Sequence, residues 1–533
     1  MKRLLLFLLE ISGFTPLFAQ LPGTYTLPIS TSTIPYYADN TIIRNYNNNY
    51  NIIMTHGEYP NTYCYNEYPP DIRNADRSHF YLQEISTGTL THIVSLGCHY
   101  EVKDVRFVTL RRDDGLETPV TYCCFCGTHT ADSAIEYGHA IGDEPVPITY
   151  IYAKRGFAGF FSMDDALSPT STCTAKVRYV EGTRDLYRMV AYPEDSGHYF
   201  QYQTSYIDNA VLDIVGTPMN SAAPSCMARV KFYPDYPVSY YPSGTHWDNN
   251  IRYEATTQEV MTDIVATSDS IITASHIAGD STTIWLRHSL KENHFHPGGL
   301  ELEWTVYQLD MNSLNMGGWM PYTYEGQLYW KRYRLCEMNS DKYALSFFYM
   351  PRLFTSYGLI VNRYSINGGF TLLDGRYLKE PYMPGDMVYL STSMEHALIL
   401  DEYGGTDNKT AIISVDNSSP HPYQCTMLDA YPMRFSSLTY RNNSGNEVLY
   451  WGGLKSGGGD DSRVANEYET DCWNGINCME QKMDDTSDAS IDYNTDSYPF
   501  LIKARYFDNQ INYPVNIITF DPYITTPEIE CQE

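Results

Sequence analysis

The segment Thr121-Tyr-Cys-Cys-Phe-Cys-Gly127 contains the local pattern on which the predicted fold rests. It is a short apolar run, rich in cysteine and aromatic residues, and a glycine ends it. After a polar insertion the apolar text resumes at Ile148-Thr-Tyr-Ile-Tyr152 and at Gly156-Phe-Ala-Gly-Phe-Phe161, and the acidic pair Asp164 and Asp165 follows. Two apolar strands separated by a polar loop are typical of an antiparallel pair. One such pair cannot bury its own faces, so a chain built from several pairs must stack them.

The same pattern recurs along the chain in seven units. The runs assigned to them are Tyr50–Met54 with His79–Ile85; Val102–Val108 with Thr121–Gly127 and Gly156–Phe161; Asp185–Ala191 with His198–Tyr202 and Ala210–Ile214; Ser268–Ser275 with Thr283–Arg287; Asp341–Phe348 with Gly358–Tyr364; His396–Asp401 with Thr410–Val415; and Asn446–Trp451 with Phe500–Arg505. Successive units begin about 50 to 80 residues apart, which suits propeller blades that carry loop insertions. Long amphipathic helical patterns are hard to find.

These observations predict an all-β chain that forms a single β-propeller of short antiparallel strands, because radial repetition of small sheets protects their edges. Seven blades fit best, and six or eight are the alternatives. Two β-sandwich or jelly-roll domains in tandem would also show many short strands. No Pro/Gly/Ser linker divides the chain at its middle, however, which favours the propeller.

The two ends of the chain have their own composition. Residues 1–20 have a basic start, an apolar stretch and a small-residue exit, which predicts a secretory signal peptide. Residues 21–40 form an extended lead that can close the ring, residues 41–510 form the propeller with an acidic insertion at 457–498, and residues 511–533 form a C-terminal tail. No later run reaches the ~18 apolar residues of a membrane-spanning helix. The chain is therefore expected to be secreted or extracytoplasmic, in the periplasm or at a cell surface.

Composition narrows the classes of partner. The formal net charge is −28, and such an acidic chain repels phosphate backbones, so nucleic acid is a poor partner. Tyrosine, with 49 copies, and the abundant β-branched residues favour strands. Of the 12 cysteines, Cys472 and Cys478 lie close together in a polar loop and are the predicted disulfide. Cys123, Cys124 and Cys126 lie in an apolar strand, where buried free thiols are expected.

Several of these runs also resemble a known group of proteins. The run that ends in Phe125-Cys-Gly127, the segment Gly156–Phe161, and Ser270-Ile-Ile-Thr-Ala-Ser-His276 with the strand of Trp285 are similar to uncharacterised exported β-propeller-like proteins of Bacteroidales bacteria. The resemblance runs through most of the chain after residue 20. It implies an exported repeat protein and transfers no catalytic residue.

Metal-binding patterns in the sequence are incomplete. Asp492, Asn494 and Asp496 place oxygen ligands at alternate positions, as a calcium loop does, but the glycine at the sixth position is missing and Lys503 stands where a closing Glu would be. His288, His294 and His296 are the best imidazole cluster, and ordinary solvated histidines are the alternative to a metal site. We therefore expect no cofactor, with calcium as the alternative.

Aromatic clusters in turn-rich text supply the candidate ligand-binding residues. They are Tyr240, Tyr241, Trp247, Trp319 and Tyr322. Exposed Tyr and Trp suit sugar rings or peptide partners, whereas packing between blades is the structural alternative. No catalytic motif is present, and no catalytic residue is assigned.

Three functions remain at this level. The first is a non-enzymatic binding or interaction module that presents propeller loops to a glycan or a cell-surface protein. The second is a polysaccharide hydrolase that uses two carboxylates about 5 to 10 Å apart in the propeller funnel. The third is a structural spacer.

Overall fold

The structure of the chain is a computed structural model. It describes residues 24–26, 37–58, 76–87, 89–97, 99–111, 119–134, 150–170, 173–194, 209–219, 223–233, 246–254, 258–277, 283–291, 305–310, 333–338, 342–349, 358–366, 371–378, 382–391, 395–402, 410–415, 423–428, 433–443, 446–456, 479–480, 497–507 and 510–519.

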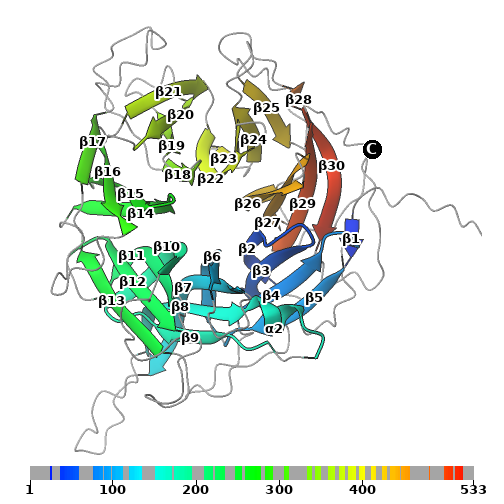
Figure 1. The fold of residues 1–533 in the computed structure, drawn as a ribbon. Helices are drawn as coiled ribbons and strands as arrows, with labels where there is room; N and C mark the ends of the chain where they lie inside the picture. Colours follow the sequence, from blue (N-terminus) through cyan, green and yellow to red (C-terminus); the bar gives the residue numbers. More distant parts are fainter. Residues whose placement is uncertain are drawn as a thin grey trace, which may run out of the picture.

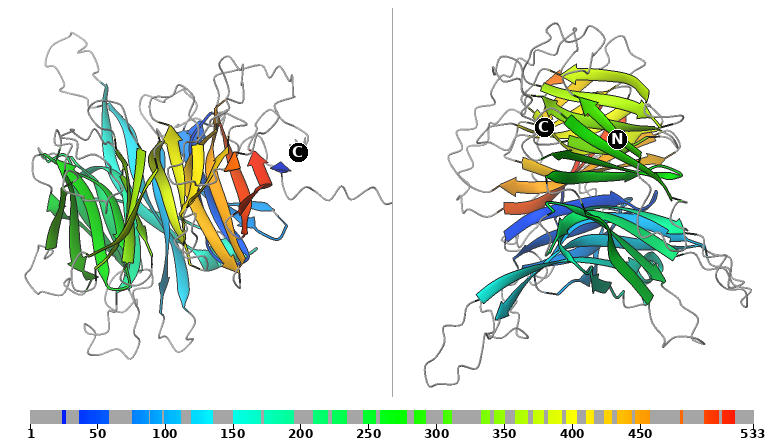
Figure 2. Two further views of the ribbon diagram at one scale, coloured as in Figure 1. Left: turned by 90° about the horizontal axis from the view of Figure 1, so that it is seen from above. Right: turned by 90° about the vertical axis from the view of Figure 1, so that its left-hand side faces the viewer.

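The described strands form seven sheets arranged around one axis, antiparallel apart from two short edge strands (Figures 1 and 2). The first three sheets consist of β2 (Tyr37–Asn45), β3 (Tyr50–Glu58), β4 (Asp76–Glu84) and β5 (Leu90–Ser95); β6 (Tyr100–Leu110), β7 (Val120–Ala134), β8 (Tyr150–Ser162) and β9 (Lys176–Tyr179); and β10 (Thr183–Glu194), β11 (Asn209–Pro218), β12 (Cys226–Tyr233) and β13 (His246–Glu254). The next two consist of β14 (Glu259–Ala266), β15 (Ser270–Ile277), β16 (Thr283–Leu290) and β17 (Thr305–Asp310); and β18 (Tyr333–Glu337), β19 (Lys342–Tyr349), β20 (Gly358–Ser365) and β21 (Thr371–Leu378).

Two further sheets complete the ring, and each has a short fifth strand. They consist of β22 (Tyr382–Leu390), β23 (Glu395–Glu402), β24 (Thr410–Val415), β25 (Tyr423–Leu428) and β28 (Met479–Glu480); and β26 (Met433–Asn443), β27 (Asn446–Ser456), β29 (Ser497–Phe507), β30 (Gln510–Thr519) and β1 (Thr24–Thr26). The first strand of each sheet contacts the first strand of the next, and β26 contacts β2, so the ring closes on itself. The predicted β-propeller is confirmed, and each sheet is a blade.

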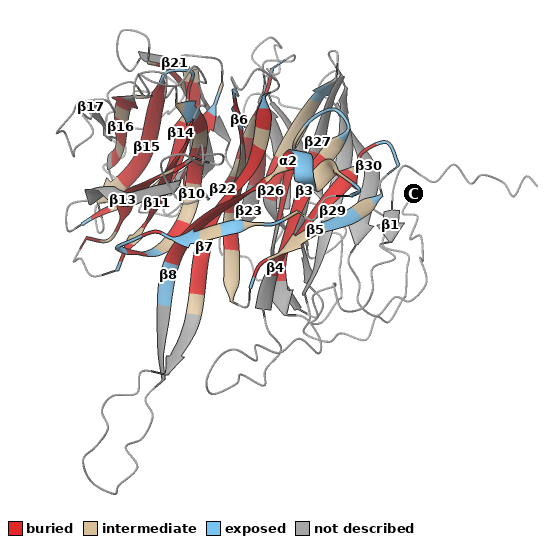
Figure 3. Cartoon of the chain, turned by 60° about the horizontal axis from the view of Figure 1, so that its bottom comes forward, coloured by how far each residue is buried: buried red, intermediate tan, exposed pale blue. Residues whose placement is uncertain are grey.

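The segment Thr121–Gly127 lies in β7, and the two directions in which its side chains point explain why it is apolar throughout. Cys123 and Phe125 pack into a core shared with the first blade, next to Phe80. Cys124 and Cys126 point the other way, into a core shared with the third blade. Because successive side chains of a strand face opposite sides, a strand between two neighbouring blades must be apolar on both faces. Figure 3 shows the buried residues that run along β7 and β15. The three thiols are free and buried, as predicted.

The innermost strands are irregular, and five of their register shifts lie at corresponding positions, whereas the shift of β2 lies four residues before Arg44. Six of the seven ladders between the first and second strands shift register, at Ala38/Asn40, Val102/Asp104, Leu186/Arg188, Met261/Asp263, Pro384/Met387 and Phe435/Ser437. A β-bulge re-aims the side chains beside it. Five of the irregularities therefore lie where polar residues, such as Asp104 and Asp263, enter the inner strands near the axis.

The ends of the fold differ in part from the predicted boundaries. Thr24–Thr26 pairs in parallel with β30 and adds an outer strand to the last sheet. β30 itself runs from Gln510 to Thr519, so the last sheet extends past the boundary predicted at residue 510. The only described helix, α2 (Met163–Leu167), begins at Ser162, whose hydroxyl accepts a hydrogen bond from Asp164 N.

Close packing in the second blade yields a stability prediction. A Cβ atom on Gly159 would lie 2.5 Å from the Phe125 ring and 2.7 Å from Lys176 O. Gly159→Ala should therefore lower the free energy of unfolding by about 1–3 kcal/mol, the usual cost of overpacking a core. At Gly97 the nearest atom is Tyr100 Cε2 at 3.3 Å, so Gly97→Ala is the matched control with a smaller effect. Equal urea midpoints for the two variants would contradict this packing.

Candidate functional site

Three aspartates link neighbouring blades next to the axis. Asp104 on β6, Asp263 on β14 and Asp386 on β22 each accept a hydrogen bond from the backbone N–H of the following residue, at 2.9, 2.9 and 3.3 Å. The second carboxylate oxygen of each aspartate accepts an N–H from the inner strand of the next blade. These donors are Met189 N at 3.0 Å, Leu335 N at 2.8 Å and Leu438 N at 2.9 Å.

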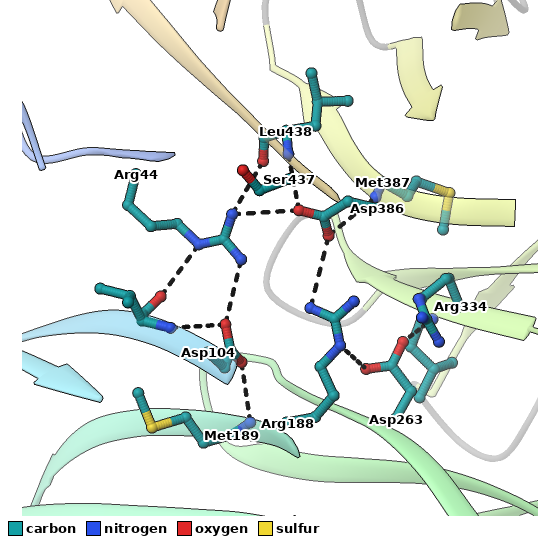
Figure 4. A network of polar contacts seen from close by, with 12 residues as sticks. Arg44, Asp104, Arg188, Met189, Asp263, Arg334, Asp386, Met387, Ser437 and Leu438 are labelled. Carbon is teal, nitrogen blue, oxygen red and sulfur yellow. Dashed lines mark hydrogen bonds and ion pairs between the residues drawn. The ribbon is translucent and has the colours of Figure 1, made fainter. Parts of the chain in front are cut away.

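A serine makes the corresponding link where the ring closes. Ser437 Oγ on β26, in the last blade, accepts a hydrogen bond from Ile43 N on β2 at 2.9 Å. Arg188 and Arg334 lie on the strands β10 and β18, between those that carry the aspartates, and Arg44 lies on β2, between the strands of Asp104 and Ser437 (Figure 4). Basic and acidic inner strands therefore alternate around the axis until Ser437.

Arg44 donates hydrogen bonds to the protein from all three of its guanidinium nitrogens. Its Nε atom donates to Val105 O, and its Nη1 atom donates to Ile43 O, Leu438 O and Asp386 Oδ2. Its Nη2 atom donates to Asp104 Oδ1 at 3.2 Å. The guanidinium thus joins the first, second, sixth and seventh blades, and we assign it a structural role.

Arg188 is placed differently. Its Nε atom lies 4.0 Å from Asp263 Oδ1 and its Nη1 atom lies 3.9 Å from Asp386 Oδ1. These are ion pairs, but both separations exceed hydrogen-bond length. Figure 4 shows these ion pairs on both sides of Arg188; among the described residues no hydrogen bond joins its N–H groups to either carboxylate.

A cavity of about 590 Å³ lies against this network, towards the ends of the inner strands. All seven inner strands line it, with Arg44 from β2, Arg106 from β6, Arg188 from β10, Asp263 from β14, Glu337 from β18, Asp386 from β22 and Thr439 from β26. Ser391 and Glu337 are exposed, so the cavity reaches solvent beside them. Its size lies within the range of small-molecule pockets, about 300–1,000 Å³. We take this central cavity as the candidate functional site.

The floor of the cavity is the side formed by the buried residues of the network, and it includes Asp263 and Asp386. Burial and charge pairing shift the pKa values of these two carboxyl groups in opposite directions. Burial penalises the charged form of Asp386, but Arg44, Arg188 and the N–H of Leu438 outweigh it and lower the pKa to about 2. For Asp263, burial dominates over Arg188 and Arg334 and raises the pKa above its ordinary value. Asp386 is therefore a firmly ionised structural group.

The described residues contain few of the positions predicted from sequence. Tyr240, Tyr241, Trp319, Tyr322, Cys472, Cys478, Asp492, Asn494 and Asp496 lie outside them. Trp247 lies in β13 opposite Phe232, near the end of β12. His288 lies in β16, and its Nε2 atom is 2.9 Å from Ser270 Oγ, while His294 and His296 lie outside the described residues. Among described residues no group of His, Cys, Asp and Glu is arranged to hold a metal ion.

The aspartates and arginines next to the axis are not among the functional residues predicted from the sequence. A weak signal was present, because a charged residue followed by an apolar one recurs in the inner strands, as in Asp104-Val105, Asp263-Ile264 and Asp386-Met387. That pair is too short to stand out among 64 acidic residues. The spatial alternation with arginine becomes visible only once the blades are placed around the axis.

The known proteins similar to this chain share little of its sequence. No family model and no curated protein matches the chain. Solved structures similar to it include the NanB sialidase from Streptococcus pneumoniae, at 10% identity and a TM-score of 0.33 over 81% of this chain and 67% of that one. A Trypanosoma rangeli sialidase matches at 6% identity and a TM-score of 0.33, over 79% of this chain and 53% of that one. A Pyrococcus horikoshii acylaminoacyl peptidase matches at 6% identity and a TM-score of 0.30, over 78% and 58%. This chain thus spans about half of the Trypanosoma chain.

Across the described ranges, the structure has no helix of the length and apolarity that crossing a membrane requires.

The closing serine gives a test of the inter-blade links. Ser437→Ala removes the acceptor of Ile43 N at a site where Ser437 is 1% exposed. An unsatisfied buried donor costs about 1–3 kcal/mol, so the free energy of unfolding should fall by that amount in urea titrations. Ser86, which is exposed in a turn, supplies the matched control Ser86→Ala, expected to change stability by less than about 0.5 kcal/mol. Equal stability of the two variants would refute the role of the link.

The lowered pKa of Asp386 predicts an acid-dependent loss of stability. Because folding lowers this pKa from 3.8 to about 2, the contribution is complete above pH 3.8 and disappears as the pH falls towards 2. The shift corresponds to about 2 kcal/mol. Asp386→Asn should be less stable than the wild type at pH 6, and the difference should shrink by about 2 kcal/mol between pH 5 and pH 2. Urea titrations at both pH values measure this. A difference that does not change with pH would show that Asp386 does not titrate as stated.

Proposed function

We propose that the chain is an exported, non-enzymatic binding module that holds a glycan through the central cavity and the rim around it. The observation that supports this proposal best is the cavity itself, which is polar, reaches solvent and is lined by all seven inner strands. Rigid strands that converge on one cavity preorganise its walls, which lowers the entropic cost of binding. Export follows from residues 1–20 and from the resemblance to exported propeller-like proteins, and both remain predictions from sequence.

The state of the carboxylates supports binding over hydrolysis. Hydrolysis of a glycosidic bond ordinarily uses two carboxyl groups, one as acid and one as base or nucleophile. Each carboxylate oxygen of Asp263 and Asp386 already accepts a backbone N–H, two of them from the next blade. Glu337 on the wall is the cavity carboxylate without such a bond among the described residues. A hydrolase would have to break inter-blade links to use Asp263 or Asp386, so a binding site accounts better for them.

Ser391 offers a test that leaves the axial network intact. Ser391 is exposed and lines the cavity, so Ser391→Trp places a large ring at its mouth. The wild-type chain is applied to a glycan array, and reducing-sugar release is measured on the glycans that bind. We expect binding without release, and at least tenfold weaker binding by Ser391→Trp. Ser86→Trp, at an exposed turn, is the matched control and should bind as the wild type does.

Three results would overturn the proposal. Sugar release by the wild type would indicate the hydrolase instead. Undiminished binding by Ser391→Trp, or no binding to any glycan, would remove the cavity as a glycan site.

A further inference from the structure

The floor of the cavity has unused hydrogen-bond donors. Arg188 lines the cavity, its side chain is 14% exposed, and its ion pairs at 3.9 and 4.0 Å leave its N–H groups without a protein acceptor among the described residues. A guanidinium carries five N–H donors in a planar fork. A buried donor without an acceptor is costly, so Arg188 needs solvent or a ligand to complete its bonding.

Arg106 adds a second guanidinium to the same cavity. Its Nε atom donates to Met189 O at 3.1 Å, next to Arg188 in the chain, and its Nη2 atom lies 3.2 Å from Asp104 Oδ2. One hydrogen bond and one ion pair therefore hold the guanidinium beside Arg188. The side chain is nevertheless 34% exposed and lines the cavity, so a ligand in the cavity can reach it.

The acceptors of the floor, in contrast, are occupied. Asp263 and Asp386 use all four carboxylate oxygens for backbone N–H groups, and Asp386 also binds Arg44. The free hydrogen-bonding capacity at the floor is therefore donor capacity. An acceptor group on a ligand fits it, and an oxyanion fits best because the planar fork matches a carboxylate or sulfate in two bonds.

The wall has the opposite character. Glu337 is exposed on the wall, and among the described residues its carboxylate has no hydrogen bond. It can accept from a hydroxyl group and would repel a second anion. Phe107 and Tyr440 also line the cavity and are half-buried, so each offers part of an apolar ring face. Such faces suit the apolar side of a sugar ring.

We infer that the central cavity binds an acidic saccharide, with its oxyanion held by Arg188 and Arg106 at the floor and its hydroxyl groups directed to Glu337 at the wall. This inference rests on the proposed function and names the class of glycan. The ligand must place one oxyanion near the arginines and several hydroxyl groups near the carboxylate of Glu337. An acidic saccharide has both kinds of group, whereas an acidic peptide carries no row of hydroxyl groups.

The net charge of −28 acts against the approach of an anion, and this sets the conditions of the test. At about 0.15 M salt the Debye length is about 8 Å, so distant surface carboxylates are screened while contacts inside the cavity are kept. Affinities should therefore be measured at physiological ionic strength.

Isothermal titration of the full chain with D-glucuronate, its methyl ester, glucose 6-sulfate and a tri-glutamate peptide tests the inference. At least one of the two anionic sugars should bind tenfold or more tightly than the neutral ester and than the peptide. The pair of sugars also distinguishes a carboxylate from a sulfate. Arg188→Lys keeps the charge but removes the fork, and Arg106→Gln removes a charge, so each should weaken binding of the acidic sugar at least tenfold.

Two control variants test whether a loss of binding is specific to the cavity arginines. Arg155→Gln alters an exposed arginine that lies over the Tyr179 ring, away from the cavity lining, and should bind as the wild type does. Glu337→Gln keeps an acceptor and removes a like charge, so the acidic sugar should bind at least as tightly. Thermal melting of every variant shows that it is folded.

Different results would contradict the acidic-saccharide inference and the proposed glycan-binding function. Binding of the methyl ester or the peptide at least as tightly as both anionic sugars, or unchanged affinity in folded Arg188→Lys and Arg106→Gln, would overturn the acidic-saccharide inference. If the array still shows neutral glycans that Ser391→Trp no longer binds, the binding module stands without it.

Discussion

The hydrogen bond from an inner-strand N–H to a side chain of the preceding blade is the constraint on which this structure depends. Each innermost strand pairs with its own sheet along one edge, and its other edge faces the axis. Buried backbone groups on that edge require partners. Asp104, Asp263, Asp386 and Ser437 supply acceptors for four of these strands, and each acceptor belongs to the neighbouring blade. The same bond therefore satisfies an edge and fixes the contact between blades.

The identity of the axial residues follows from placing charges in a buried ring. Three carboxylates near one axis would repel one another strongly in a medium of low dielectric constant. Arginines on the intervening strands compensate them, and Arg44 alone reaches both Asp104 and Asp386. Around seven inner strands a strict alternation of basic and acidic residues must fail once. It fails at β26, where the neutral Ser437 makes the link and adds no uncompensated charge.

The strands that could be predicted from the sequence are those with a continuous apolar run. The second strand of a blade, such as β7 or β11, is buried on both faces and is recognisable as an apolar run. The inner strands β2, β14, β18, β22 and β26 are not among the predicted runs, whereas β6 and β10 are, although Asp104 and Arg188 interrupt them as Asp263 and Arg334 interrupt β14 and β18. Their partners are far along the chain, and Arg44 and Asp386 are 342 positions apart. A local sequence pattern does not show which distant residues pair in the fold, so the cavity could not be predicted.

Arg44 and Arg188 show how one network can hold the ring and still leave a binding site. Both are flanked by aspartates, but Arg44 directs its donors to three backbone carbonyls and two carboxylates, whereas Arg188 stands 3.9 Å or more from its carboxylates. A buried arginine gains most stability when every N–H is bonded. An arginine used only for stability would be expected to close that distance. Holding Arg188 between Asp263 and Asp386 without bonding it keeps its position fixed and its donors available, which is what a preorganised anion site requires.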